Sequence, residues 1–232
     1  VSIGGIQILE IGGWPAPFGI VLVVDMLSAL LLTTTSFVGI ACILFAFKSI
    51  GEEREQFYFY PLFQFLITGV NGSFLTGDLF NLFVCFEVML ISSYVLLSLG
   101  GTRIQFRETI KYVVINSLSS TLFLVAVAYL YASVGTLNIA HLSIRVAEAG
   151  QTGFMTTIAI LFLTVFSLKA ALFLFFWLPG SYSAAPTAIA AVFGALLTKV
   201  GIYAIFRMFY LVFYHQPEIT HALMGVMAAL TM

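Results

Sequence analysis

Residues 79–99, LFNLFVCFEVMLISSYVLLSL, form an apolar run that contains one charged residue, Glu87. About 20 apolar residues in a helix cross the roughly 30 Å hydrocarbon core of a bilayer, so the run is long enough for one crossing. Glu87 lies nine residues after Asp78, the expected start of the helix. That spacing places the carboxyl about 13 Å deep, near the bilayer centre. The stretch predicts an α-helical membrane protein with an ionisable group at mid-membrane depth.

The composition of the whole chain also indicates a lipid environment. Of its 232 residues, 61 % are hydrophobic and 8 % are charged, and the mean hydropathy is +1.11. Soluble domains carry about 25 % charged residues, so this chain lacks a polar coat. The net charge of −1 gives no electrostatic footprint for nucleic acid. Cys42 and Cys85 lie in apolar runs without metal-type spacing, so we expect two small buried hydrophobic residues.

Turn residues and charged loops divide the chain into successive apolar segments. The run 57–99 is too long for one crossing, and residues 71–78 (NGSFLTGD) supply a turn and a helix cap. Residues 1–17, which include Gly12-Gly13-Trp14-Pro15, predict an extramembrane turn or hairpin. Because the chain starts at Val1 and stops inside an apolar run, we expect a fragment of a longer chain. Residues 18–232 are predicted to form one all-α polytopic helix bundle, with spans at 18–47, 57–75, 79–99, 109–132, 154–178 and from 222 onward.

Residues 179–186, PGSYSAAP, interrupt the apolar pattern and predict a discontinuous helix. The run that follows, 187–214, would be about 42 Å long as a single helix, which exceeds the bilayer core. Two arrangements fit: one strongly tilted helix, or a broken helix followed by a new span near 198–214. Non-helical backbone at membrane depth must be covered by protein or line a water-filled cavity. Broken helices of this kind are typical of transporter sites.

Basic residues predict which side of the membrane each loop faces. The loops and helix ends on the side reached by the first span carry most of them, and the opposite loops carry only Arg145. Because Lys and Arg gather on the cytoplasmic side, we expect the side reached by the first span to be cytoplasmic. The residues that decide this orientation are Lys48, Arg54, Arg103, Arg107 and Lys111.

Two lysines, like Glu87, lie inside apolar runs. Placing an ionisable group inside a span costs free energy, so such groups are candidates for function. Lys169 lies nine residues before residues 177–179, the expected helix end, again about 13 Å deep. Lys199 lies about 21 Å along a helix that starts near Ala185, or near the end of one that starts later. A lone buried glutamate holds its proton and a lone buried lysine loses one, whereas in contact each favours the charged form of the other. If Glu87 and a lysine lie in contact and the contact can be made and broken, the lysine can carry a proton and the pair titrates as a unit. A carboxyl that stays protonated and a purely structural ion pair are the alternatives.

Other polar residues receive structural interpretations. Asp78 is predicted to cap a helix, Lys111 to reach the interface, and Arg207 to face an interface rather than a cavity. The patch NSLSST at 116–121 is typical of close helix packing, with a hydrated passage as the alternative. The sequence contains no nucleotide-binding, metal-ligand or hydrolase motif, so we expect no cofactor, no metal and no enzyme activity.

Several motifs together resemble the family of antiporter-like membrane subunits. These are FLTGDLFNLF (74–83), FEVM (86–89), FWLP (176–179), APT (185–187) and TKVGIY (198–203), together with Lys169. The family includes the pumping subunits of respiratory complex I and the large subunits of Mrp-type multisubunit Na+/H+ antiporters. Within it, GDLFN (77–81) and LPGSYS (178–183) are most similar to the D subunits of Mrp complexes. Complex I relatives usually carry a histidine before Trp-Leu-Pro and Asp-Ala after it, whereas residues 175–180 here are FFWLPG.

The resemblance implies two inverted five-helix repeats, of which this chain holds the first and the start of the second. It implies that Glu87 and Lys169 pair between the fifth and seventh helices, and that Lys199 on the eighth continues the proton path. It also implies a multi-pass protein of the bacterial cell (plasma) membrane. Expected partners are the other subunits of a hetero-oligomeric antiporter complex, with H+ and Na+ as the transported ions.

The expected function is proton translocation in exchange for Na+. The alternative is a proton-pumping membrane subunit of a complex I-like quinone oxidoreductase or membrane hydrogenase. A third interpretation is a scaffold that transports nothing, in which case the three buried charges would be an unexplained cost. Neutral substitution of Glu87 and Lys169 separates transport from scaffolding.

Overall fold

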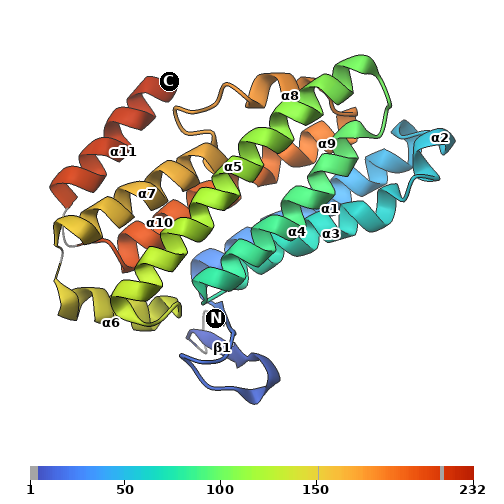
Figure 1. The fold of residues 1–232 in the computed structure, drawn as a ribbon. Helices are drawn as coiled ribbons and strands as arrows, with labels where there is room; N and C mark the ends of the chain where they lie inside the picture. Colours follow the sequence, from blue (N-terminus) through green and yellow to red (C-terminus); the bar gives the residue numbers. More distant parts are fainter. Residues whose placement is uncertain (1–4, 151, 215–216) are drawn as a thin grey trace.

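The structure, a computed structural model, describes residues 5–150, 152–214 and 217–232. It is a bundle of helices with a short β-hairpin at one end (Figure 1). The helices in this described part that are long and apolar enough to cross a membrane are α1 (Met26–Ser49), α4 (Leu79–Ser98), α5 (Arg103–Val134), α7 (Gly153–Ala170) and the continuous stretch Thr187–Leu211. The predicted all-α polytopic membrane fold is confirmed.

The long run 57–99 divides where the sequence predicted. Helix α3 (Phe59–Leu75) ends before the turn at 76–78, and α4 returns alongside it. The two helices approach closely at Gly69, where an added Cβ would lie 2.6 Å from the backbone nitrogen of Met89. A glycine here allows backbone-to-backbone contact that any larger residue would prevent. The short helix α2 (Glu52–Glu55) occupies the charged loop between α1 and α3, at the end of the bundle away from the hairpin (Figure 1).

The hairpin is fastened to the turn between α3 and α4. Its antiparallel strands are β1 (Gln7–Glu10) and β2 (Val21–Val24), with the 3-10 turn η1 (Ile11–Gly13) after the first strand. The Gly77 N–H donates to the Val21 carbonyl at 2.8 Å, and the Ile139 N–H donates to the Gly77 carbonyl at 2.8 Å. Ile139 begins helix α6 (Ile139–Ala149). These bonds place the starts of α1, α4 and α6 together at the hairpin end.

The discontinuous helix breaks earlier than predicted. Helix α7 ends at Ala170, eight residues before the expected end at 178, and Ala171 (φ 55°) and Phe173 (φ 63°) turn the chain away. The Trp177 indole N–H donates to the Leu168 carbonyl at 3.1 Å, so side chains satisfy backbone groups that the break exposes. Residues 171–177 are apolar, and hydropathy alone does not distinguish a packed apolar loop from a helix.

The segment predicted to interrupt the helix, 179–186, is itself mostly helical. It forms α8 (Leu178–Ala184) because proline at the first turn of a helix needs no intrahelical donor. The elements after it are α9 (Thr187–Val192), the π-helical turn η2 (Phe193–Leu197) and α10 (Thr198–Leu211). These three elements follow one another without a gap and form one helix about 37 Å long. Of the two predicted arrangements, the structure therefore has the single long helix, and no new span begins near 198.

The last helix, α11 (Pro217–Thr231), lies at the edge of the bundle beside α7 (Figure 1). It begins five residues before the predicted start at Ala222. The predicted loop at 215–221 falls partly on residues 215 and 216, which lie outside the described residues, as do residues 1–4 of the predicted hairpin segment.

Candidate functional site

Glu87 and Lys169 meet inside the bundle through one serine hydroxyl. Ser120 of α5 donates a hydrogen bond from Oγ to Glu87 Oε1 at 2.5 Å. The Lys169 ammonium donates to the same Ser120 Oγ at 3.1 Å. The described side chains of Glu87 and Lys169 form no direct ion pair within 4.0 Å. The predicted acid and base are therefore brought together, and a third residue stands between them.

The surroundings of Lys169 are nearly dry. Lys169 is 5 % exposed, and its ammonium lies 5.0 Å from the centroid of the Phe86 ring. A cation over an aromatic face gains electrostatic attraction, more when water is excluded. The Phe86 ring packs against Phe123 and Phe166, with centroids 6.0 and 6.4 Å away. Consecutive residues of α4, Phe86 and Glu87, thus supply an aromatic face and a carboxylate to one small cluster.

The position of Lys169 along its helix differs from the prediction. It lies in the last turn of α7, one residue before the helix ends, and not nine residues inside it. A lysine in the last turn interacts favourably with the negative end of the helix dipole. The break at 171–177 therefore sets the ammonium at a helix end within the protein, where it donates to the Ser120 hydroxyl.

A close helix contact fixes the backbone beside Lys169. An added Cβ at Gly201 of α10 would lie 2.5 Å from the Ala170 nitrogen and 2.7 Å from its Cα. Real Cβ atoms do not come so close to backbone, so only glycine permits this approach. The glycine of the TKVGIY motif (198–203) accordingly holds α10 against the end of α7.

Lys199 is not joined to this cluster. It is the thirteenth residue of the 25-residue helix Thr187–Leu211, which places it mid-helix as one of the two alternatives predicted. Its side chain is exposed, and among the described residues its ammonium donates to the Gly194 carbonyl at 2.5 Å. Gly194 lies in the π-helical turn η2, and π-turns inside α-helices occur frequently at functional sites.

A second acid–base pair lies near the hairpin end. Arg207 of α10 forms an ion pair with Asp25 at 2.5 Å and donates from Nε to the Tyr203 hydroxyl at 2.8 Å. That hydroxyl donates in turn to the Phe74 carbonyl at 2.7 Å. Asp25 also caps α1, because its carboxylate accepts the Ser28 N–H at 2.8 Å. The pair thereby ties α1, α3 and α10 together.

The charges around Asp25 act in opposite directions on its proton affinity. Burial by itself raises the pKa of this carboxyl, but the Ser28 backbone N–H and the Arg207 guanidinium outweigh burial. The pKa of Asp25 therefore lies below its usual value, and the ion pair is charged at neutral pH.

Arg207 also lines a cavity, which the sequence analysis did not predict. The cavity holds about 460 Å³ between the hairpin, the turn at 76–78, α6 and α10, and Glu10 and Tyr203 lie at its walls. The hairpin and α6, which form the other walls of this cavity, come from distant parts of the chain, and the sequence pattern around Arg207 does not identify them. The expectation that Arg207 faces an interface rather than a cavity was wrong.

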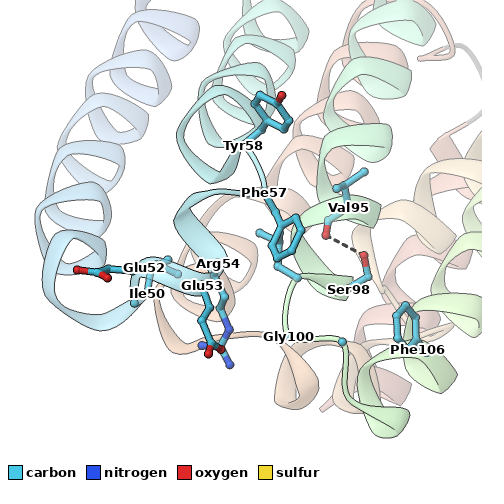
Figure 2. A pocket seen from close by; sticks show the side chains of 13 residues that line it. Ile50, Glu52, Glu53, Arg54, Phe57, Tyr58, Val95, Ser98, Gly100 and Phe106 are labelled. Carbon is cyan, nitrogen blue, oxygen red and sulfur yellow. Dashed lines mark hydrogen bonds between the residues drawn. The ribbon is translucent and has the colours of Figure 1, made fainter.

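A larger cavity, about 910 Å³, lies at the opposite end between α2 and the turn after α4 (Figure 2). Figure 2 shows Glu52, Glu53 and Arg54 on one side and Phe106 on the other, with Phe57 between them. None of the predicted site residues lines this cavity. In the part of the chain that the structure describes, no group of three or more His, Cys, Asp or Glu side chains is placed to hold a metal ion.

Two further predictions concern helix ends. Asp78 does cap α4, since its Oδ1 accepts the Asn81 N–H at 2.8 Å, which confirms the prediction. Burial raises the pKa of this capping carboxyl.

Lys111, in the third turn of α5, donates to Glu108 Oε1 at 3.0 Å. Gly180 of α8 makes room for that carboxylate, because an added Cβ would collide with Glu108 Oε2.

Sequence reasoning did not single out Ser120. Its signal was present as one member of the polar patch at 116–121, for which close packing and a hydrated passage were both open. The patch in fact serves several purposes. Ser119 donates to the Val165 carbonyl of α7 at 3.3 Å, Thr121 donates to the Ser117 carbonyl of its own helix, and Ser120 contacts both charges.

The fold and the site define a polytopic membrane protein with an acid and a base joined through a hydroxyl inside its helix bundle. Residues 76–232 match the family described as NADH:quinone oxidoreductase/Mrp antiporter, TM. The chain belongs to this family.

Individual relatives refine the comparison. The chain is 58 % identical over 229 residues to the D subunit of the Na(+)/H(+) antiporter of Alkalihalophilus pseudofirmus, a match that covers 98 % of this chain and 46 % of that relative. The chain thus spans about half the length of this relative. Its fold is similar to a chain of the Mrp complex from Dietzia sp., with a TM-score of 0.82 and 35 % identity over 92 % of this chain and 40 % of that one.

A second solved structure is equally similar in fold. It is the membrane-bound sulfane sulfur reductase, an archaeal respiratory membrane complex, with a TM-score of 0.86 and 36 % identity over 91 % of this chain and 43 % of that one. The curated relative is named as an antiporter subunit, which is a transporter component and not an enzyme.

Proposed function

We propose that this chain is the proton-translocating part of a subunit of a multisubunit Na+/H+ antiporter in the bacterial plasma membrane. Protons pass through Glu87 and Lys169 and continue through Lys199, and their movement is coupled to Na+ leaving the cell. The remaining subunits of the complex are its partners. The observation that carries the proposal is the meeting of Glu87 and Lys169, from two different spans, on one buried hydroxyl.

The energetics support a transport role for this cluster. A buried charge pair is costly to desolvate, and apolar residues of the same size are often equally stable or more so. The rings of Phe123 and Phe166 pack beside the cluster and are fully buried, so apolar side chains already fill this part of the core. A site that keeps an acid and a base one hydroxyl apart is suited to moving a proton.

A redox-driven complex is the second candidate. It is favoured by the 36 % identity to a chain of the archaeal respiratory membrane complex. The 58 % identity to the D subunit of an Na(+)/H(+) antiporter favours the antiporter. Co-purification with a redox arm would support the second candidate, and purification with antiporter subunits alone would support the first.

The test uses the full-length protein with its partner subunits in a Na+-sensitive bacterial host. Na+-dependent collapse of the pH gradient is measured in inverted vesicles for wild type, Glu87→Ala, Glu87→Gln and Lys169→Ala. Glu148→Ala and Lys48→Ala are the matched controls, since both residues are exposed and lie outside the cluster. We expect antiport to be lost in the first three variants and kept in the controls, with the complex assembled at normal abundance in all.

Normal antiport in the Glu87 and Lys169 variants would contradict the proposal. The chain would then be a scaffold, or the proton would pass through another subunit.

A further inference from the structure

We propose that Ser120 is a proton-relay residue whose hydroxyl passes protons between Lys169 and Glu87. This inference rests on the proposed function, because it takes the two charges to be part of the proton path. Nothing in the sequence pattern distinguishes Ser120 from its neighbours, and only the geometry assigns it this role.

The two hydrogen bonds at Ser120 have a single direction. A serine hydroxyl donates one hydrogen bond and accepts others, and here it accepts from the Lys169 ammonium and donates to the Glu87 carboxylate. The chain of donors therefore runs N–H to O–H to carboxylate oxygen. Ser120 is 6 % exposed and Lys169 is 5 % exposed, so bulk water has little access to the lysine end of this chain, while Glu87 at the other end is half-buried.

This arrangement permits a balanced proton transfer. An N–H bond of Lys169 breaks as an O–H bond forms on Ser120, while the original O–H bond of Ser120 breaks as an O–H bond forms on Glu87 Oε1. The products are a neutral amine, a neutral carboxylic acid and an intact serine hydroxyl. The hydrogen bonds then point the opposite way, from the acid to serine and from serine to the amine, so the reverse transfer uses the same path.

The intervening hydroxyl also keeps the two charges from closing into a tight pair. Opposite charges in direct contact at low dielectric attract strongly and resist separation, as the Asp25–Arg207 pair illustrates. With Ser120 between them, the Glu87 carboxylate and the Lys169 ammonium do not touch, and a proton passes from one to the other through the serine hydroxyl. The ammonium is stabilised meanwhile by the Phe86 ring.

The neighbouring serine offers a control built into the chain. Ser119 is 1 % exposed and donates to the Val165 carbonyl of α7 at 3.3 Å, so it bonds backbone and neither charge. The two serines are adjacent, buried and contact the same helix. A role in packing would affect both, whereas a role in proton relay belongs to Ser120 alone.

The experiment compares Ser120→Thr with Ser120→Val in the assembled complex, by antiport in inverted vesicles. These two side chains have nearly the same shape and differ in the hydroxyl. We expect Ser120→Val to lower the antiport rate about tenfold or more, in line with the loss of one positioned acid–base group. We expect Ser120→Thr to stay within about twofold of wild type, and Ser119→Ala likewise.

Equal antiport in Ser120→Val and Ser120→Thr would overturn the relay, because the hydroxyl would then be irrelevant. The Glu87 and Lys169 variants separate this result from failure of the proposed function. If the Glu87 and Lys169 variants are inactive while Ser120→Val is active, the proposed role of Ser120 is wrong and the proposed function stands. If they are active as well, the proton path itself lies elsewhere.

Discussion

Two acid–base pairs that join different helices, Asp25–Arg207 and Glu87–Lys169, differ in how their charged groups meet. At the hairpin end, Asp25 and Arg207 touch directly, and Ser28 and Tyr203 complete their hydrogen bonds. Inside the bundle, Glu87 and Lys169 are joined only through another side chain. The first pair links three helices and fixes their positions.

The direct contact fits a structural role for Asp25 and Arg207, and the bridged contact fits the transport role proposed for Glu87 and Lys169. A closed pair, which is in direct contact with satisfied hydrogen bonds, is stable. Removing one partner leaves the other charge buried without compensation, which costs free energy. Under the proposed function, the bridged pair gives up part of that stability and provides a proton path. We therefore expect substitutions at the first pair to affect folding and substitutions at the second to affect transport.

The largest expected effect comes from shortening the acid of the bridged pair. Glu87→Asp keeps the carboxylate but withdraws it by one carbon–carbon bond, about 1.5 Å, so the hydrogen bond from Ser120 is lost. We expect antiport to fall about tenfold to a hundredfold with normal assembly, measured in inverted vesicles beside Glu87→Gln. Wild-type rates in Glu87→Asp would show that the contact with Ser120 does not matter.

Next in size is the effect of widening the helix contact beside Lys169. Gly201→Ala places a Cβ against the Ala170 backbone, and overpacking of this kind costs about 1–3 kcal/mol. We expect less assembled complex and slower antiport per complex, measured by quantitative blotting and vesicle assays. Gly225→Ala in α11 is the control, since an added Cβ there meets nothing within 4 Å. Equal behaviour of the two variants would contradict this reading of the contact.

At the closed pair we expect a loss of stability with transport retained. Arg207→Ala leaves Asp25 without its guanidinium partner, at a cost of about 1–3 kcal/mol. The measurement is the thermal unfolding midpoint of the purified complex, with antiport per assembled complex alongside. Arg145→Ala is the control, because the Arg145–Glu148 pair is 3.6 Å long and more than half exposed, and such pairs contribute little. Lost antiport in well-assembled Arg207→Ala complex would place the closed pair in the ion path.

The smallest expected effect is a pH dependence of the closed pair. Because the pKa of Asp25 is below its usual value in the folded protein, the pair stabilises the fold above the usual value, about 3.9. That contribution is lost as the pH falls through the folded pKa. The difference in thermal midpoint between wild type and Asp25→Asn should therefore narrow below about pH 4. A difference that stays constant into acid would indicate that the charge of Asp25 is not what stabilises this junction.

Much of the fold was predictable because bilayer thickness constrains helix length directly. The split of the run 57–99 and the cap at Asp78 followed from turn residues, and both are present. The break around 171–177 was misplaced, because an apolar loop packed inside protein has the hydropathy of a helix. Pro179 was predicted to interrupt the helix, but it lies in the first turn of α8, where proline is well tolerated.

The sequence by itself determined that the chain has helices long and apolar enough to span a membrane, because that conclusion depends on composition and segment length alone. It also made Glu87 and Lys169 candidates for function, although the depth expected for Lys169 was wrong. Only the tertiary structure decided that Ser120, and not its neighbour Ser119, lies between the two charges. It also decided that Asp25, 182 positions before Arg207 in the chain, is the partner of that arginine. Such contacts depend on how helices rotate and pack against one another, and hydropathy along a single chain does not specify that rotation.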